Sequence, residues 1–312
     1  MKKRDYTRNS PQVSEIGFGA WQLGNTQDWA PMTEEEGIRL VQRAIELGVN
    51  FFDTSPNYGL GNSERLLGKA LKNVERSKLV ISTKFGHHED GHTDYSPKVL
   101  RHSIEGSLSR LQMTYLDSVL LHNPSADYLA GTHPIYEELE NLKKEGLIRA
   151  YGSSVDSAKD MLAVLNSTDS EVMEVFFNIF HQDTRLAFAK AEEKGVALIN
   201  KIPLDSGWLS GKYGANSHFD GIRSRWSPED IKRRAGLLEE ISFLTEDGLT
   251  LSQAALSYIL HYKAIATIIP GAKNIAQLEE NVKVSDIRLT DETVKRLEAF
   301  YERQIKFNPL PW

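Results

Sequence analysis

The sequence predicts one α/β domain over residues 1–312, a single (β/α)8 TIM barrel with an N-terminal extension and extra C-terminal helices. Three observations favour this fold. Apolar stretches alternate with helical stretches from Val13 to about Pro270, eight apolar stretches can be counted, and no linker divides the chain. Eight such units in a chain somewhat longer than the ~250 residues of a typical barrel indicate one closed parallel sheet.

Recurring signals mark where the predicted helices begin and end. A threonine followed three residues later by Glu or Gln forms a capping box, and a serine followed by proline places proline at the first helical position. A glycine followed at once by an apolar strand is typical of a helix that ends in a left-handed cap. Helix starts are predicted at Thr33, Ser63, Ser96, Pro134, Thr184, Ser227 and Thr250, and helix ends at Gly48, Gly146 and Gly195.

The predicted strands are short, apolar and rich in β-branched residues. The run from Leu79 to Lys84 is too continuous to alternate, as expected for a strand covered on both faces. A doubly wound sheet is the main alternative, but no Gly-x-Gly-x-x-Gly follows the first strand, which disfavours it. Strand starts are predicted at Ile16, Val49, Leu79, Asp117, Leu147, Val172, Val196 and Ile265, with the fifth strand extending from Leu147 to Ser153.

Charge and composition exclude several classes of partner. Lys and Arg total 37 against 43 for Asp and Glu, a net charge of −6 that argues against nucleic-acid or anionic-membrane binding. The absence of Cys excludes disulfides and thiolate metal sites, and it fits a reducing compartment. No apolar run approaches the ~18–20 residues of a membrane span, and the charged N-terminus lacks the apolar core of a signal peptide. We therefore expect a cytoplasmic monomer or weak oligomer that binds small molecules.

Polar residues follow the predicted strands at their C-terminal ends. In a parallel barrel these ends converge on one mouth, which is where barrel enzymes carry catalytic residues. A Tyr hydroxyl titrates near pH 10, so we expect the charge of Lys84 to lower the pKa of Tyr58, and Asp53 to hold Lys84 in place. His122 would orient or polarise a carbonyl oxygen. The strand-end residues are Trp21, Asp53 with Tyr58, Lys84, His122, Ser154, Lys201 and the loop at Gly271.

Six stretches of the sequence, taken together, are a specific signature of one protein family, although each stretch alone is a weak signal. They are residues 16–24, residues 53–58 with Ser63 and Glu64, residues 82–86, residues 116–122, residues 203–212 and residues 269–281. In these stretches the chain resembles the aldo-keto reductases, a family of NADPH-dependent carbonyl reductases on a (β/α)8 barrel whose superfamily includes potassium-channel β-subunits. The resemblance extends from Val13 to about Leu297.

The resemblance implies a catalytic set, a cofactor and no metal. The family tetrad falls on Asp53, Tyr58, Lys84 and His122, with Tyr58 as the general acid that protonates an aldehyde or ketone, or a sugar-like substrate oxidised in reverse. A cation at Lys273 suits a 2′-phosphate, so NADPH/NADP+ is favoured over NADH. Cofactor contacts are implied at Gly19, Ala20, Trp21, Ser154, Asn178, Lys201, Pro203, Leu204, Ser206, Gly211, Lys212, Gly271, Lys273, Gln277, Glu280 and Asn281, with residues 204–212 on the pyrophosphate and residues 273–281 on the adenosine end.

The chain departs from the family pattern around the nicotinamide. Many relatives have Ser-Asn after strand five, where this chain has Ser154 and Val155. Strand six usually carries Gln four residues before an Asn, but Glu174 precedes Asn178 here, and Lys201 stands where many relatives stack an aromatic ring. The departures leave open a second hypothesis, that of a cofactor-binding regulatory subunit with little turnover.

Two polar runs invite alternative interpretations. The run from His87 to His92 resembles a metal cluster in composition, but it lies in a glycine-containing loop without helical spacing, which favours a solvated loop near the substrate. The basic run from Arg223 to Arg234 is most simply a solvated helix face, with a lid over the cofactor phosphates as the alternative.

Overall fold

Eight parallel strands form one sheet in which each strand pairs with its neighbour in the chain. The computed structural model describes residues 1–26 and 31–312, apart from the side chains of residues 222 and 223. The sheet order is β10-β9-β8-β7-β6-β5-β4-β3. Its strands are β3 (Phe18–Gly19), β4 (Phe51–Asp53), β5 (Val80–Phe85), β6 (Ser118–His122), β7 (Tyr151–Val155), β8 (Val172–Phe176), β9 (Ala197–Lys201) and β10 (Ile265–Ile268).

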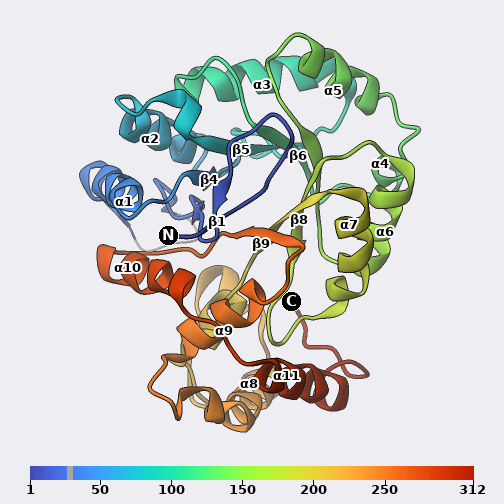
Figure 1. The fold of residues 1–312 in the computed structure, drawn as a ribbon. Helices are drawn as coiled ribbons and strands as arrows, with labels where there is room; N and C mark the ends of the chain where they lie inside the picture. The colour runs from blue at the N-terminus through green and yellow to red at the C-terminus, as the bar shows by residue number, and fades with distance from the viewer. Residues whose placement is uncertain (27–30) are drawn as a thin grey trace.

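Backbone contacts between the first and last strands close the sheet into a barrel. Ile16, just before β3, forms a parallel bridge with Ile268 of β10. The Gly17 nitrogen donates to the Ile268 oxygen at 2.7 Å, and the Ile268 nitrogen donates to the Glu15 oxygen at 2.9 Å. The predicted (β/α)8 barrel is confirmed, and its helices surround the sheet (Figure 1).

The helix signals lie where the sequence predicts them. Thr33 and Thr250 form capping boxes with Glu36 and Gln253, and the three predicted end glycines have left-handed φ values of 89°, 81° and 67°. The α-helices are α1 (Glu34–Glu46), α2 (Asn62–Leu71), α3 (Pro97–Leu111), α4 (Ala126–Leu129), α5 (Ile135–Lys144), α6 (Ala158–Ser167), α7 (Phe188–Lys194), α8 (Pro228–Glu240), α9 (Leu251–Leu260), α10 (Ile275–Lys283) and α11 (Asp291–Gln304). Short 3-10 helices are η1 (Arg76–Lys78), η2 (Asp183–Ala187), η3 (Asp205–Ser210), η4 (Gly221–Arg225), η5 (Ser242–Thr245) and η6 (Val284–Asp286).

Two predicted boundaries are wrong. The fifth strand begins at Tyr151 rather than Leu147, because the chain before it makes only an isolated bridge between Ile148 and Leu116. The helix predicted from Thr184 begins instead with η2, and α7 follows it. The Thr184 hydroxyl donates to the Phe176 oxygen at 2.9 Å, which ties the start of this helical segment to the end of β8.

The N-terminal extension forms a hairpin that covers the floor of the barrel. Strands β1 (Lys3–Arg4) and β2 (Val13–Ser14) pair antiparallel. Tyr6, in the turn between them, is buried, and its hydroxyl lies 2.7 Å from the Ser118 hydroxyl at the start of β6. Its ring meets Phe51 edge-on at 5.4 Å. The open end opposite the catalytic mouth is therefore closed by side chains that come from outside the barrel.

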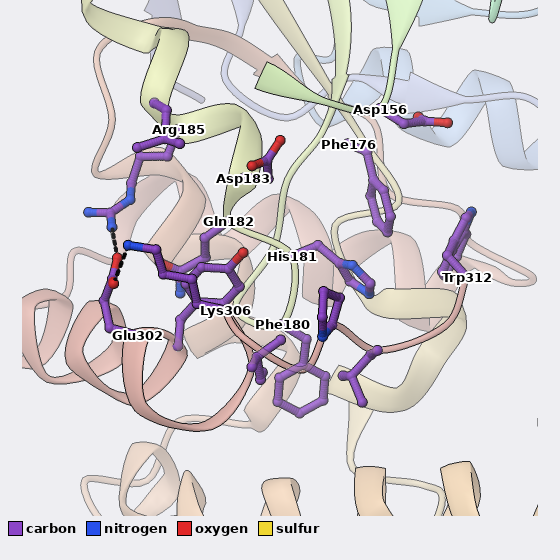
Figure 2. Close-up of a pocket in the computed structure, with 15 residues that line it drawn as sticks. Asp156, Phe176, Phe180, His181, Gln182, Asp183, Arg185, Glu302, Lys306 and Trp312 are labelled. Carbon is purple, nitrogen blue, oxygen red and sulfur yellow. Dashed lines mark hydrogen bonds and ion pairs between the residues drawn. The ribbon is translucent and has the colours of Figure 1, made fainter. Parts of the chain in front are cut away.

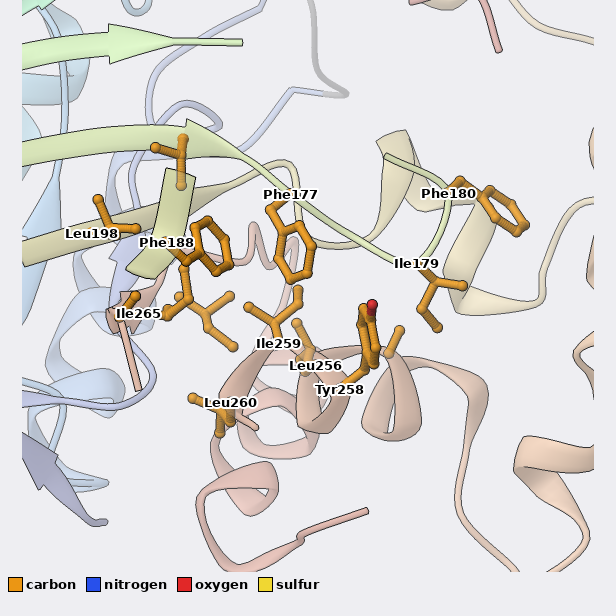
Figure 3. Close-up of a cluster of buried hydrophobic side chains, with 14 of the residues drawn as sticks. Phe177, Ile179, Phe180, Phe188, Leu198, Leu256, Tyr258, Ile259, Leu260 and Ile265 are labelled. Atoms are coloured by element: carbon orange, nitrogen blue, oxygen red, sulfur yellow. The ribbon is translucent and has the colours of Figure 1, made fainter. Parts of the chain in front are cut away.

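The core outside the sheet is filled by aromatic and branched side chains between β8, β9 and the helices that cover them (Figure 3). Phe177 stacks on Tyr258 of α9 at 5.6 Å and meets Phe188 of α7 edge-on at 5.0 Å. Aromatic pairs in these geometries stabilise a core beyond the area they bury. This packing fixes the end of β8, just before Asn178.

A methyl group at Gly152 is expected to destabilise the barrel. An added Cβ at this position in β7 would lie 1.6 Å from the Val172 oxygen, which belongs to the adjacent strand and cannot move independently. Gly152→Ala should lower the free energy of unfolding by at least about 1–3 kcal/mol, the range typical of overpacking. The control is Gly236→Ala in α8, where no atom lies within 4 Å of an added Cβ. Urea unfolding with equal midpoints for the two variants would contradict this assignment.

Candidate active site

Four polar side chains from three neighbouring strands meet at the C-terminal mouth of the barrel. Asp53 ends β4, Lys84 lies near the end of β5, His122 ends β6, and Tyr58 follows β4 on its exit loop. The Lys84 ammonium donates to Asp53 Oδ1 at 2.5 Å and lies 5.1 Å from the centre of the Tyr58 ring. The rings of Tyr58 and His122 meet edge-on at 6.0 Å. The four strand-end residues identified in the sequence are thus brought together.

Burial determines the protonation state of Tyr58. Desolvation raises the pKa of this hydroxyl well above its usual value of 10.0, and the nearby Lys84 charge lowers it by less. Lys84 therefore acts on the pKa of Tyr58 in the expected direction, but burial outweighs its effect. The hydroxyl is protonated at neutral pH, as a proton donor must be.

His122 is a neutral ring. Burial lowers the pKa of His122 well below its ordinary value, and the positive charges of Lys84 and Lys201 lower it further. Its Nδ1 lies 3.3 Å from the Ser55 hydroxyl, so the ring orientation is fixed by the loop after β4. A neutral imidazole at this position donates or accepts a hydrogen bond without adding a charge to the site.

Three aromatic residues flank this group on the open side. Trp21 lies 6.3 Å from the Tyr58 ring, and His87 lies 4.9 Å from the His122 ring. The Tyr95 hydroxyl donates to the backbone oxygen of His122 and lies 3.2 Å from His87 Nε2. Sequence reasoning missed Tyr95, because it lies in the loop before α3 rather than at a strand end and no local motif marks it.

Lys201 ends β9 inside a cluster of oxygen atoms. Its ammonium donates to Asn123 Oδ1 at 2.8 Å and to the Ser154 hydroxyl at 2.7 Å, and it lies 2.9 Å from Asp156 Oδ1. All three of its N–H groups are therefore occupied by side chains from the ends of β6 and β7. The side chain is 8% exposed, so this cation is held firmly against the site.

Asn178 is also fully engaged. Its amide nitrogen donates to the Ile202 oxygen at 2.9 Å, and its side-chain oxygen accepts from the backbone nitrogens of Phe180 and His181 at 2.9 and 3.1 Å. These bonds join the loop after β8 to the loop after β9. In this structure Asn178 positions two loops, and its side chain is not directed freely into the mouth.

The stretch predicted to bind pyrophosphate forms a tight turn after β9. Pro203 and Leu204 lead into η3, where Asp205, Ser206 and Gly207 have φ values of 46°, 55° and 98°. Left-handed backbone is costly for residues with a side chain, so a run of this kind persists only where the surroundings fix it. Asp205 supplies part of that support, because its buried carboxylate lies 3.2 Å from His181 and 3.3 Å from Arg234. Gly211, with a φ of 75°, ends the turn before Lys212.

The stretch predicted to bind the adenosine end lies beside a cavity of about 570 Å³. Lys273, the first residues of α10 and Gln22 are among the residues that line it. Gln22 is buried, and both polar atoms of its amide lack a hydrogen-bond partner among the described residues. Gln277 accepts from the Lys273 backbone nitrogen at 2.8 Å, and Glu280 accepts from the Thr250 hydroxyl at 2.6 Å. Asn281 is buried on the inner face of α10, and Gly271 is exposed before it.

At the first strand, Gly19 and Ala20 lie under the mouth. An added Cβ at Gly19 would lie 2.8 Å from the Ile269 oxygen, so the close approach of the first strand to the last requires glycine here. The Ala20 nitrogen donates to the Asp53 oxygen at 2.8 Å. These contacts place the first strand directly beside the backbone of Asp53.

A second cavity, of about 340 Å³, lies beside the mouth, between the ends of β7 and β8 and the chain that follows α11 (Figure 2). Asp156 at its rim joins it to the Lys201 cluster. Trp312 covers one side, 4.7 Å from Phe176 and 5.8 Å from His181. The tetrad side chains do not line this cavity.

The basic run near α8 holds the C-terminal segment. Arg233 donates to the backbone oxygens of Gln304 and Asn308, and Arg234 donates to the Pro311 oxygen at 2.7 Å. The solvated-face interpretation is wrong for these two residues, because both are partly or fully buried against the end of the chain. Arg225 donates to the Ser206 hydroxyl at 3.3 Å, whereas the side chain of Arg223 lies outside the described residues.

Two other features are absent from the described residues. No group of three or more His, Cys, Asp or Glu side chains in the described part of the chain could hold a metal ion. In the run from His87 to His92, the rings of His88 and His92 stack at 4.5 Å instead. No helix among the described residues has the length and apolar character needed to cross a membrane.

The sequence model of the Aldo/keto reductase family matches residues 15–302 of this chain. The chain belongs to the aldo/keto reductase family. It is therefore an NAD(P)H-dependent oxidoreductase, and the family expected from its motifs is confirmed.

Relatives and solved structures extend over nearly the whole chain. The chain is 31% identical over 306 residues to an L-galactose dehydrogenase of Arabidopsis thaliana, covering 93% of this chain and 91% of that protein. It is 29% identical over 334 residues to a probable voltage-gated potassium channel subunit beta of Oryza sativa subsp. japonica, covering 98% of both. An aldo-keto reductase from Bacillus halodurans in its holo form superposes with a TM-score of 0.81 at 28% identity, covering 96% of each chain.

Proposed function

We propose that this aldo/keto reductase uses NADPH to reduce an aldehyde, a ketone or a sugar-like carbonyl compound, or oxidises the alcohol in reverse. One observation carries the proposal: a half-buried, protonated Tyr58 stands beside the Lys84 ammonium and the neutral His122 ring at the barrel mouth. A phenol that keeps its proton at neutral pH and has a cation beside it suits proton donation to a carbonyl oxygen.

Each member of the set has a separate task. Tyr58 donates its proton to the substrate oxygen, and Lys84 stabilises the phenolate that remains. Asp53 holds Lys84 through the 2.5 Å contact. His122 is a neutral ring that meets the Tyr58 ring edge-on. It hydrogen-bonds the same substrate oxygen and orients it. When bound, the nicotinamide cofactor supplies a hydride to the carbonyl carbon.

The residues at the cofactor positions fit a phosphorylated dinucleotide. Both Lys273 and the buried amide of Gln22, which has no hydrogen-bond partner among the described residues, line the 570 Å³ cavity. We propose that Lys273 and Gln277 bind the 2′-phosphate, that Glu280 and Asn281 bind the adenine, and that the turn from Leu204 to Lys212 binds the pyrophosphate. At the nicotinamide end, Ser154 and Lys201 form a hydrogen-bonded pair that would border the ring, and Asn178 holds the loops that frame them. Gly19, Ala20, Trp21, Pro203 and Gly271 would complete the cofactor contacts.

Replacing Lys273 should weaken the binding of NADPH but not that of NADH. Lys273→Met removes the cation proposed to bind the 2′-phosphate, so we expect the dissociation constant of NADPH to rise about tenfold, or about 1.4 kcal/mol, while that of NADH stays the same. Quenching of protein fluorescence by each cofactor measures both. Lys283→Met, at the exposed end of helix α10, which begins shortly after Lys273, is the control. An equal loss of affinity for both cofactors would overturn the assignment.

The mouth suits a polyhydroxylated substrate. Trp21, His87 and Tyr95 offer aromatic faces and ring nitrogens around the tetrad. A similar protein from Arabidopsis thaliana is an L-galactose dehydrogenase, which supports a sugar-like compound. A panel of aldehydes, ketones and sugars, assayed by NADPH consumption and by NADP+ reduction, would identify the substrate class and the favoured direction.

A regulatory subunit is the second candidate, and the similarity to a potassium channel subunit beta favours it. Such a protein would bind NADPH tightly and turn over slowly. Rapid mixing of the NADPH complex with carbonyl compounds separates the two functions. Oxidation of one equivalent of NADPH followed by a very slow steady state supports regulation, and sustained turnover supports the enzyme.

A further inference from the structure

Glu174 is a buried carboxyl in contact with the catalytic lysine, and the four-residue set does not include it. It lies in the middle of β8 and is 2% exposed. Its Oε2 lies 3.1 Å from the Lys84 ammonium, and its Oε1 accepts from the Ser154 hydroxyl at 3.3 Å. Strand register explains the contact with Ser154, because Ser154 of β7 pairs with Glu174 of β8.

The Lys84 ammonium has more acceptors than protons. An ammonium has three N–H groups. Lys84 donates to Asp53 Oδ1 at 2.5 Å and to the Thr54 oxygen at 3.1 Å, which leaves one N–H. The Glu174 carboxyl lies 3.1 Å from the ammonium, and the centre of the Tyr58 ring lies 5.1 Å from it. The charge on Glu174 therefore bears directly on how strongly Lys84 binds Tyr58.

The remaining carboxyl oxygens to consider near Lys84 are Oδ2 of Asp53 and Oε2 of Glu174. Asp53 Oδ2 and Glu174 Oε2 are both buried, and neither makes a hydrogen bond within the described residues, although Glu174 Oε2 has the 3.1 Å ion-pair contact with Lys84. The two carboxyl groups contact the same Lys84 nitrogen, Asp53 Oδ1 at 2.5 Å and Glu174 Oε2 at 3.1 Å. Two ionised carboxylates beside one ammonium would leave a buried negative charge without compensation, which is strongly unfavourable. One proton between the two oxygens satisfies both and balances the charge.

We propose that Asp53 and Glu174 share one proton at neutral pH, and that Glu174 is a positioning residue that controls Tyr58 through Lys84. With the proton in place, one negative charge faces Lys84, and the third N–H of Lys84 is available to Tyr58. Loss of the proton adds a second negative charge, which draws that N–H toward the carboxylates and makes the Tyr58 phenolate harder to form. The catalytic part of this proposal rests on the proposed function, but the shared proton does not.

The same pair provides a proton after each reduction. Tyr58 transfers its proton to the substrate oxygen and becomes a phenolate, which takes a proton from the Lys84 ammonium. Lys84 then takes the shared proton from the carboxyl pair and is an ammonium again, while both carboxylates are ionised. The pair regains its proton from water before the next reduction. Each transfer breaks one bond to hydrogen and forms another, and no redox partner is needed.

The surroundings favour a retained proton. Burial raises the pKa of Asp53 well above its usual value, and the charge of Glu174 raises it further, against the opposing effect of Lys84. Tyr6, which is buried and faces Asp53 from the barrel floor, has a pKa raised chiefly by burial and so adds no charge. Tyr58 is protonated, as described above. Lys201 reaches Glu174 only through Ser154.

Infrared spectroscopy of the protein without substrate tests the shared proton directly. Protein labelled with 13C in Asp and Glu side chains should show the carbonyl stretch of a protonated, buried carboxylic acid at pH 7, and the band should disappear in Glu174→Gln. This variant keeps the shape of the side chain and leaves Asp53 alone with Lys84. The control is Glu171→Gln, just before β8, where the carboxylate pairs with Lys143 at 2.6 Å and is 29% exposed. No acid band in the wild type, or the same band in Glu174→Gln, would overturn the proposal.

The pH dependence of stability gives a second readout. The folded protein retains a proton that the unfolded chain releases near the ordinary pKa of Asp, because the folded pKa of Asp53 is raised. The stability that this proton gives is therefore present at low pH and is lost as pH rises through the folded pKa. Glu174→Gln removes the like-charge pair, so its Tm relative to the wild type should increase from pH 6 to pH 9. A constant difference would contradict the proposal.

Kinetics distinguish this proposal from the proposed function. In the wild type, kcat for reduction should fall at alkaline pH as the carboxyl pair loses its proton. In Glu174→Gln, kcat should not show this alkaline decrease, and the dissociation constant of NADPH should equal that of the wild type. Identical pH profiles would overturn the role of Glu174 with the reductase function intact. Failure of Tyr58→Phe to affect turnover would instead overturn the proposed role of Tyr58, and the infrared result would stand.

Discussion

Tyr58→Phe is expected to lower kcat for carbonyl reduction by about 10²–10⁴-fold, the usual contribution of a positioned general acid. The ring and its packing against Trp21 and His122 are kept, and only the hydroxyl beside Lys84 is lost. The dissociation constant of NADPH should not change, because the proposed cofactor contacts are on other strands. Steady-state assays on the best substrate of the panel, with cofactor titrations, measure both quantities.

The control for this experiment is Tyr95→Phe. Tyr95 donates to the backbone oxygen of His122 and borders the mouth, but it does not contact Lys84. We expect a moderate rise in KM and little change in kcat. Similar kcat values for the wild type and Tyr58→Phe would exclude Tyr58 as the proton donor, whatever the effect of Tyr95.

Lys84→Met should have the largest effect on stability. The side chain is fully buried between Asp53 and Glu174, and its removal leaves two buried carboxyl groups without a counter-charge. Loss of one partner from a buried ion pair costs about 3–5 kcal/mol. We therefore expect a drop of this size in the free energy of unfolding at pH 7, together with loss of reductase activity.

The pH dependence of this loss follows from the charges. Burial alone would lower the pKa of Lys84, but the charges of Asp53 and Glu174 raise it well above its ordinary value. The stabilisation that the ammonium gives is therefore present throughout the neutral range. In Lys84→Met the carboxyl groups can bind protons at low pH, so the deficit should shrink from pH 8 to pH 5. Combining Lys84→Met with Glu174→Gln should restore part of the stability, and urea unfolding at each pH measures it. A deficit that is independent of pH would contradict the electrostatic explanation.

The barrel was predictable because its signals are local. Capping residues such as Thr33 and Thr250 fix helix starts through bonds within one turn of the chain, and glycines such as Gly195 adopt the left-handed caps that end helices. Where a boundary depends on a distant partner, prediction was wrong. The helix expected at Thr184 starts with a tighter turn, and the Thr184 hydroxyl is held by the end of β8.

The sequence by itself determined the barrel and the grouping of Asp53, Lys84 and His122, because parallel strands in chain order place their last residues side by side. Only the tertiary structure decided the environment of these residues. Burial, which sums contacts from the whole fold, raised the pKa of Tyr58 against the charge of Lys84. The approach of Glu174 to Lys84 joins strands β8 and β5, which are not adjacent in the sheet, across the barrel interior. No local pattern encodes a contact of that kind, because it depends on how the closed sheet directs both side chains inward.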